Sequence, residues 1–209
     1  MENTIVEIVK SIIALLVIVD PVGALPFVAS LTRNLEHEER KRVVDRSVLV
    51  GTVLLLVFSI GGHSVLSTLG ISVASFTVAG GLLLLILAFR ILIHGGEGWQ
   101  AKTSSSGVFP LAFPLLAGPG AITTVIFSIN SLGIPYSIIP VMTVMAVTWV
   151  ILRSLDKLLT VMGEDGADAV ARIMSVFIAA IAIQYVVAGV VESATLLRFY
   201  QNDERLTPA

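Results

Sequence analysis

The sequence predicts an all-α protein that crosses a membrane six times, and three observations support this fold class. Hydrophobic residues make up 56% of the 209 residues and charged residues only 13%, whereas soluble domains carry about 25% charged residues. The mean hydropathy is +0.95. Residues 47–89 and 103–152 contain no Asp, Glu, Lys or Arg, and each stretch has room for two helices of the roughly 20 residues that a bilayer requires.

Composition also excludes several kinds of protein. The formal net charge of −2 gives no reason to expect a nucleic-acid partner, and the absence of Cys excludes disulfides, thiol nucleophiles and thiolate metal sites. The chain has no Walker motif, so ATP is not its own energy source. The first ten residues are acidic rather than basic and no small-residue cleavage pattern follows. We therefore expect the first apolar stretch to remain as a span.

Blocks of uncharged sequence define the expected spans. They are residues 5–31, 45–67, 72–93, 108–130, 135–153 and 170–191. The turn between the second and third spans is expected from Gly61 to Gly70, and a frayed polar segment is expected from Glu192. The whole chain, residues 1–209, is expected to form a single transmembrane domain.

Basic residues predict the orientation. Ten of the thirteen Lys and Arg residues lie in or beside the connections 33–46, 94–107 and 154–169. The other side has only Lys10, Arg198 and Arg205. By the positive-inside rule, both termini face away from the cytoplasm.

A break is expected in the middle of the first span. Between Ser11 and Thr32 the only charged side chain is Asp20. Pro21 and Pro26 cannot donate backbone hydrogen bonds, and Pro21 also disfavours the helical conformation at Asp20. Unpaired backbone groups facing lipid cost several kcal/mol each, so such a break survives only beside protein or a watery cavity. We interpret it as half of a binding site.

A second break and an internal repeat follow from the fourth span. Pro119, between two glycines, follows Pro21 by 98 residues, and related apolar runs near Phe76 and Phe177 are separated by 101. Each half, about 5–93 and 108–191, would hold three spans, so the second half must be inverted. The two breaks are then expected to meet near the midplane. Taken singly, either proline could be only a tolerated kink.

The expected site combines the N-termini of two half-helices with one carboxylate. Helix N-termini present free N–H groups to an anion, and Asp20 could pair with an amine or carry a proton. The candidate substrate-binding residues are Asp20, Pro21, Val22, Gly23, Gly80, Gly118, Pro119, Gly120, Ala121, Ile122, Thr123, Thr124 and Gln184. For Gly80, close helix packing is an alternative role. Gln184 could equally form a structural bridge, and Thr123 and Thr124 could cap free N–H groups.

The sequence resembles the MarC family of bacterial and archaeal inner-membrane proteins in four segments. These are Asp20–Gly23 with Pro26, Gly70–Ser72 followed by Ala79–Gly81, Pro110–Ile122, and Arg172–Met174 with Gln184. The Ala-Gly-Pro-Gly-Ala-Ile motif at residues 117–122 is the most specific. The resemblance implies an inner-membrane location and a six-helix fold like that of the lysine-exporter (LysE) superfamily. Its archaeal, SnatA-like branch is described as transporting glycine, alanine and similar amino acids. One departure is Ser175, where relatives usually have Gly.

These observations favour a secondary transporter of small neutral amino acids, coupled to H⁺ or Na⁺, over an enzyme. An exporter of another small solute or drug in the same fold is the alternative. An intramembrane enzyme could use Asp20 as a base, but the spans offer no second catalytic group beside it. The expected partners are the lipid bilayer and the substrate; an oligomer is compatible with the sequence, and no cofactor or metal is expected.

Overall fold

The computed structural model describes residues 2–32, 35–94 and 107–206, and within these ranges the chain is helical and contains no strand. This confirms the all-α fold class. The helices are α1 Glu2–Val19, α2 Pro21–Leu31, α3 His37–Thr68, α4 Val73–His94, α5 Val108–Pro110, the π-helix η2 Leu111–Leu116, α6 Pro119–Leu132, α7 Ile134–Arg153 and α8 Leu155–Leu206.

Five helices in the described ranges are long and apolar enough to cross a membrane. They are Thr4–Ala29, His37–Gly62, Val73–Ile93, Ile134–Arg153 and Arg172–Thr195. The pair Val108–Leu116 and Pro119–Ile129, bent by 53°, makes a sixth span if it is counted as one. The count therefore agrees with the expected six. Most of the predicted connection 94–107, including Lys102, lies outside the described residues.

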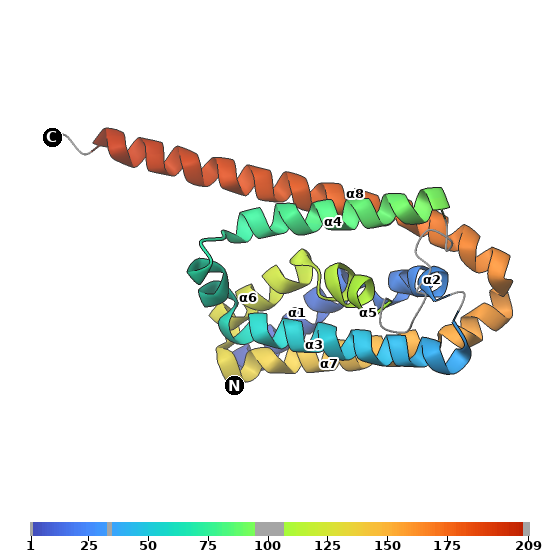
Figure 1. Cartoon of the computed structure of the whole chain (residues 1–209). Coiled ribbons are helices and arrows are strands. Elements are labelled where there is room, and N and C mark those ends of the chain that lie inside the picture. The colour runs from blue at the N-terminus through green and yellow to red at the C-terminus, as the bar shows by residue number, and fades with distance from the viewer. Residues whose placement is uncertain (1, 33–34, 95–106, 207–209) are drawn as a thin grey trace.

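The helices form three layers, as Figure 1 shows. Helices α4 and α8 lie side by side along one face, and α3 and α7 lie side by side along the opposite face. Between them are the interrupted segments α1, α2, α5, η2 and α6. Both ends of the chain lie at the same end of the bundle. The two broken spans are therefore enclosed by the continuous ones.

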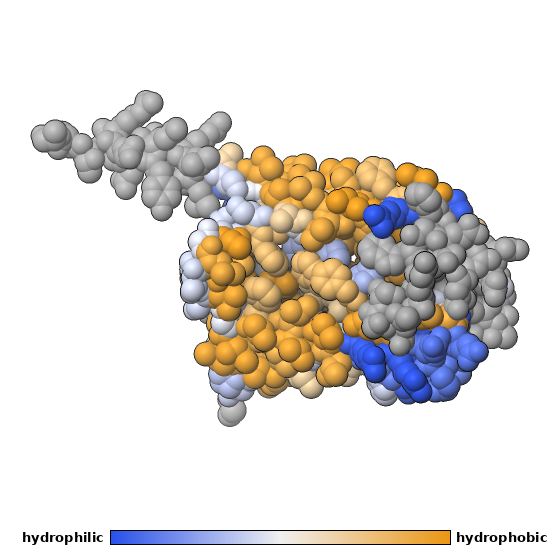
Figure 2. Space-filling view, viewed as in Figure 1, coloured by the Kyte–Doolittle hydropathy of each residue, from blue (hydrophilic) through white to orange (hydrophobic). Residues whose placement is uncertain are grey.

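The surface has the distribution expected of a protein embedded in lipid. Large apolar side chains such as Leu49, Ile86 and Val150 are at least half exposed. Figure 2 shows the middle of the molecule as predominantly hydrophobic and hydrophilic side chains gathered at the end where α3 begins. Lipid is the solvent that makes such an apolar belt favourable.

Glycine allows α4 and α8 to pack closely. A Cβ atom added to Gly81 of α4 would lie 2.8 Å from the carbonyl oxygen of Ala182 in α8. Conversely, a Cβ atom on Gly189 of α8 would lie 2.6 Å from the carbonyl oxygen of Ala74 in α4. The small-residue contact expected for membrane helices thus joins these two spans at two levels.

The structure corrects the predicted start of the second span. It begins at His37 rather than residue 45, so Arg40, Lys41 and Arg42 lie on α3 instead of in a loop. Glu38 and Glu39 occupy its first turn, where acidic residues favour a helix, and Lys41 Nζ pairs with Glu38 at 3.1 Å. The charged residues mark where the apolar part of this helix begins, but the helix itself begins eight residues earlier, at His37.

Three other segments differ from the prediction. Helix α3 continues to Thr68 with a kink at Gly61, so the turn begins only at Leu69, with Gly70 at a φ of 67°. The predicted connection 154–169 is helical on both sides of Gly163, whose φ of 70° interrupts α8. The segment after Glu192, expected to fray, continues as helix to Leu206.

An ion pair joins α3 to α7 at the basic end of the bundle. The Arg153 guanidinium donates to both Asp45 carboxylate oxygens, from Nε at 3.0 Å and from Nη2 at 2.8 Å. Trp149 Nε1 donates to the same carboxylate at 2.7 Å, and Arg153 lies 5.0 Å from the Trp149 ring centroid. The bidentate geometry fixes the register of these two helices.

Enlarging Gly81 should destabilise the helix pair. Gly81→Val would push α4 away from the Ala182 carbonyl, and overpacking of this kind costs about 1–3 kcal/mol. We expect a lower melting temperature in detergent, measured by thermal denaturation. Ala79→Val is the matched control, because Ala79 lies on the exposed side of the same helix. Equal melting temperatures for the two variants would contradict the close packing described here.

Candidate functional site

The first break is a single residue. Asp20 has a φ of 41°, in the left-handed region, and separates α1 from α2. Pro21 follows as the first residue of α2, a position that proline tolerates because its missing N–H has no partner there. The Asp20 carboxylate accepts a hydrogen bond from the Gly23 N–H at 3.0 Å, as an N-cap residue does. The break is thus shorter than the unwound stretch expected over Asp20–Gly23.

Gly23 makes room for this carboxylate. A Cβ atom at Gly23 would overlap Asp20 Oδ2, so any larger residue would displace the acid. Pro21 and Ala24 are buried, whereas Asp20 is exposed on the surface of the single chain. One carboxylate oxygen caps the helix and the other faces away from that bond.

The second break is longer and begins in η2. Its hydrogen bonds are widened, as shown by the bond from Ala117 N to Ala112 O at 2.9 Å across five residues. Gly118 is then extended, with φ −72° and ψ 173°, and Pro119 begins α6. A Cβ atom at Gly118 would overlap the Pro114 carbonyl oxygen. Glycine is therefore required at position 118, because the backbone there lies against the Pro114 carbonyl.

The N-terminus of α6 has no side-chain cap. Its first helical hydrogen bond runs from Ile122 N to Gly118 O at 2.9 Å, so the N–H groups of Gly120 and Ala121 precede the helical ladder. Gly118 at the N-cap position provides no side-chain acceptor. This end of α6 carries the positive end of the helix dipole without an acidic residue at its N-cap position, in contrast to α2.

Two neighbouring helices hold the second break in place. A Cβ atom on Gly80 of α4 would overlap the Pro119 ring, and one on Gly120 would overlap the Tyr185 hydroxyl of α8. The close-packing role is therefore the one that the structure gives to Gly80. The same contacts fix where the α6 N-terminus lies.

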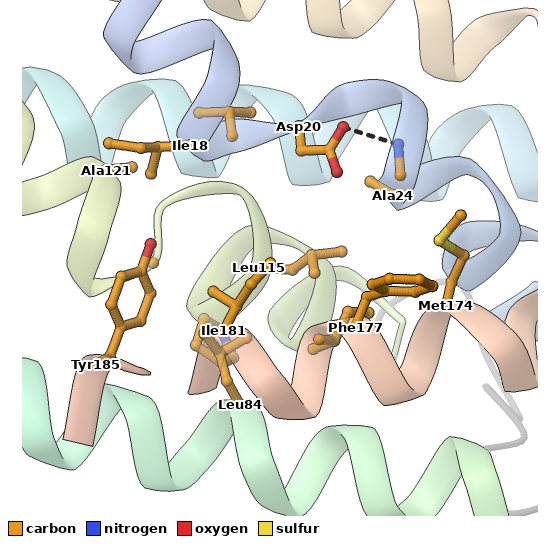
Figure 3. A pocket seen from close by; sticks show the side chains of 15 residues that line it. Ile18, Asp20, Ala24, Leu84, Leu115, Ala121, Met174, Phe177, Ile181 and Tyr185 are labelled. Atoms are coloured by element: carbon orange, nitrogen blue, oxygen red, sulfur yellow. Dashed lines mark hydrogen bonds between the residues drawn. The ribbon is translucent and has the colours of Figure 1, made fainter. Parts of the chain in front are cut away.

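A cavity of about 70 Å³ lies between the two breaks and α8. Its walls come from α1 and α2, the segment around the second break, α4 and α8. The lining residues are Ile18, Val19, Asp20, Gly23, Ala24, Leu84, Pro114, Leu115, Gly118, Ala121, Met174, Phe177, Ile178, Ile181 and Tyr185. Figure 3 shows Asp20 on the side of α1 and α2 and Tyr185 rising from α8 on another side. Asp20 is the one carboxylate among these residues.

The structure brings some of the predicted residues to the cavity and not others. Asp20, Gly23, Gly118 and Ala121 line it. Pro21, Pro119, Gly120 and Ile122 are buried beside it but do not line it. Val22 is 63% exposed on the outside of α2.

Three further predicted residues have other surroundings. The hydroxyls of Thr123 and Thr124 donate to the Gly120 carbonyl at 3.0 and 2.7 Å, so they bond backward along α6 and do not cap its N–H groups. Gln184 is exposed and lies outside the cavity lining. The rotation of α8 turns the next residue, Tyr185, to the cavity instead.

Sequence reasoning named only Gln184 on α8 as a site residue and missed the residues of this helix that line the cavity. Its residues Met174, Phe177, Ile178, Ile181 and Tyr185 recur at intervals of three and four, which is the spacing of one helix face. That periodicity was a usable signal, but other faces of α8 are equally apolar. Ser175, the departure from the MarC pattern, is buried with its hydroxyl on the Arg172 carbonyl at 2.7 Å.

The fold and the cavity define a multi-pass helical membrane protein with two interrupted spans. Residues 5–194 match the model of the MarC family of integral membrane proteins, and the chain belongs to this family. Among similar proteins, a UPF0056 membrane protein of Archaeoglobus fulgidus is 33% identical over 87% of this chain and 91% of its own. The UPF0056 inner membrane protein YhgN of Escherichia coli is 28% identical over 88% of this chain and 96% of its own. No solved structure matches significantly.

Substitutions at Asp20 should separate its capping role from its charge. Asn accepts the same hydrogen bond and tolerates a positive φ. The unfolding free energy of Asp20→Asn should therefore lie within about 0.5 kcal/mol of the parent's. Asp20→Ala loses the cap and keeps the unfavourable φ, so its unfolding free energy should fall by about 1–2 kcal/mol. Thermal denaturation in detergent measures both. An Ala variant as stable as the Asn variant would show that the cap contributes nothing.

Proposed function

We propose that this protein is a secondary transporter of small neutral amino acids, which bind as zwitterions in the cavity between the two breaks. The observation that carries the proposal is the opposite polarity of two parts of that site. Asp20 supplies a negative charge, and the uncapped N-terminus of α6 supplies N–H groups and a positive dipole end. An ammonium group suits the first and a carboxylate suits the second.

The remaining walls support a small ligand with a neutral side chain. Apart from Asp20 and Tyr185, the side chains lining the cavity are apolar or absent. A second charge on the ligand would have no partner there, and an unpaired charge in a water-poor site costs several kcal/mol. A volume of about 70 Å³ favours glycine, alanine and serine over leucine and phenylalanine.

The Tyr185 hydroxyl is the polar group best placed to assist the α6 N-terminus. It lies against Gly120, beside the first N–H groups of the helix. A hydroxyl can donate to one carboxylate oxygen while the helix N–H groups donate to the other. Tyr185 would thus orient the ligand carboxylate.

Asp20 also offers a means of cation coupling. Its carboxylate can hold either a proton or the ligand's ammonium group, but not both. When a proton and an amino acid compete for one carboxylate, the movement of one across the membrane is coupled to movement of the other in the opposite direction. We therefore propose proton antiport, in which an inward proton gradient drives amino acids outward.

The arrangement of helices is consistent with two inverted halves. The pair α4 and α8 and the pair α3 and α7 each join a helix of residues 5–93 to its expected counterpart in 108–191, and the partners run antiparallel. The broken spans lie between the pairs in the same way. In transporters built from inverted repeats, the substrate site lies at the broken helices near the midplane.

Transport can be measured in proteoliposomes. With an acidic interior, the parent protein should accumulate glycine and alanine, and lysine and glutamate should not compete. Asp20→Asn should lose accumulation driven by the pH gradient, because its amide cannot bind and release a proton. It should retain exchange, with a higher KM because the ammonium group loses its charged partner. Undiminished gradient-driven uptake in that variant would assign Asp20 a capping role only.

Tyr185→Phe tests the carboxylate end of the same site. Loss of one hydrogen bond of about 0.5–1.5 kcal/mol should raise the KM for glycine roughly two- to tenfold. Tyr136→Phe is the matched control, because Tyr136 lies exposed at the start of α7. Identical KM values for the two variants would remove Tyr185 from the site.

The basic end of the bundle is proposed to face the cytoplasm. Arg40 lies in the first turns of α3 and Arg153 ends α7, and Arg172 donates to the Leu92 carbonyl near the end of α4 at 3.4 Å. The chain termini lie at the opposite end of the bundle. By the positive-inside rule, reporters fused to the C-terminus should give the non-cytoplasmic signal. A cytoplasmic signal would reverse the orientation proposed here.

A further inference from the structure

A second hollow lies between α1 and α6, on the side of the breaks toward the chain termini. It has a volume of about 270 Å³ and is lined by Lys10, Ser11, Ala14, Thr124, Phe127 and Ser128. The Ser128 hydroxyl donates to Ser11 Oγ at 3.3 Å, which joins the two helices at this level. Unlike the central cavity, this groove is lined mostly by small and polar side chains.

A charged pair at the groove favours the presence of water there. Lys10 Nζ lies 2.7 Å from Glu7 Oε1, and both side chains are more than a third exposed. Both belong to the candidate span Thr4–Ala29, with Lys10 about 9 Å along the helix from Thr4. Charged side chains within a membrane span are costly in lipid and normally face protein or a water-filled space, or extend toward the headgroups when they lie near a helix end.

The groove and the central cavity share the same two helices. On α1, Ala14 lines the groove and Ile18 lines the cavity; on α6, Thr124 lines the groove and Ala121 lines the cavity. These pairs are separated by three or four residues, about 5–6 Å along a helix. The two spaces are thus one helical turn apart, and buried Leu15 and Ile122 lie in that turn.

We propose that this groove is a water-filled outer vestibule through which small polar solutes reach or leave the central cavity. The turn of α1 and α6 between them is the barrier that is closed in this conformation. The proposal that the groove holds water rests on its lining residues and the Lys10–Glu7 pair. The identity of the solute rests on the proposed amino-acid transport. Passage requires α1 and α6 to separate, which would break the Ser11–Ser128 hydrogen bond.

Cysteine accessibility tests the vestibule directly, because the chain has no cysteine of its own. Ser11→Cys and Ala14→Cys should react with a membrane-impermeant, anionic methanethiosulfonate added to the face that bears the termini. Val9→Cys is the matched control. Val9 is 47% exposed but lies about 140° around α1 from Ala14, on a face toward lipid.

The vestibule cysteines should react about tenfold or more faster than Val9→Cys, because thiols in water ionise and thiols in lipid do not. Modified Ala14→Cys should also lose glycine uptake, while treated Val9→Cys keeps it. Labelling no faster than the control would overturn the vestibule and leave the proposed transport intact. Fast labelling without loss of uptake would overturn its place on the solute path.

If the parent protein fails to take up glycine, the transport proposal fails and labelling alone decides the vestibule.

Discussion

The hydrogen bond from the Gly23 N–H to the Asp20 carboxylate is the interaction on which the site depends. It lets a helix stop and restart within one residue. Asp20 N still donates to Leu16 O, and Ala24 N donates to Asp20 O, each at 3.0 Å, while the Asp20 carboxylate accepts from the Gly23 N–H. Lipid offers no substitute partners for backbone groups. The same bond places the only carboxylate of the cavity beside the second break, so local backbone chemistry determines where the charge lies.

The two breaks satisfy this constraint differently, and the difference gives the site its polarity. The first has an acidic cap, whereas the second has glycine at the capping position and relies on neighbouring helices for support. Gly80 of α4 packs against Pro119, and Tyr185 of α8 packs against Gly120. The close packing of those two helices through Gly81 and Gly189 is therefore connected to the geometry of the site, although neither glycine lines the cavity.

Much of the architecture could be predicted because membranes impose simple rules on length and charge. Proline and glycine revealed both breaks, and the isolated Asp20 revealed the charge between them. Helix ends in charged segments could not be predicted in this way: α3 begins at His37 because Glu38 and Glu39 favour its first turn. Nor could the choice between Gln184 and Tyr185, since the rotation of α8 is set by its packing against α4. Thr123 and Thr124 illustrate the same difficulty, because their hydroxyls can bond to the helix behind them as readily as to a ligand.

The central claim is that the cavity recognises both charges of a zwitterion at once. Isothermal titration of the purified protein in nanodiscs with glycine, methylamine and acetate tests it most directly. Glycine should bind at least about tenfold more tightly than either half-ligand, because each of them leaves one pole of the site unpaired and forgoes about 1.4 kcal/mol or more. Acetate binding as tightly as glycine, or no heat from glycine at all, would contradict the account.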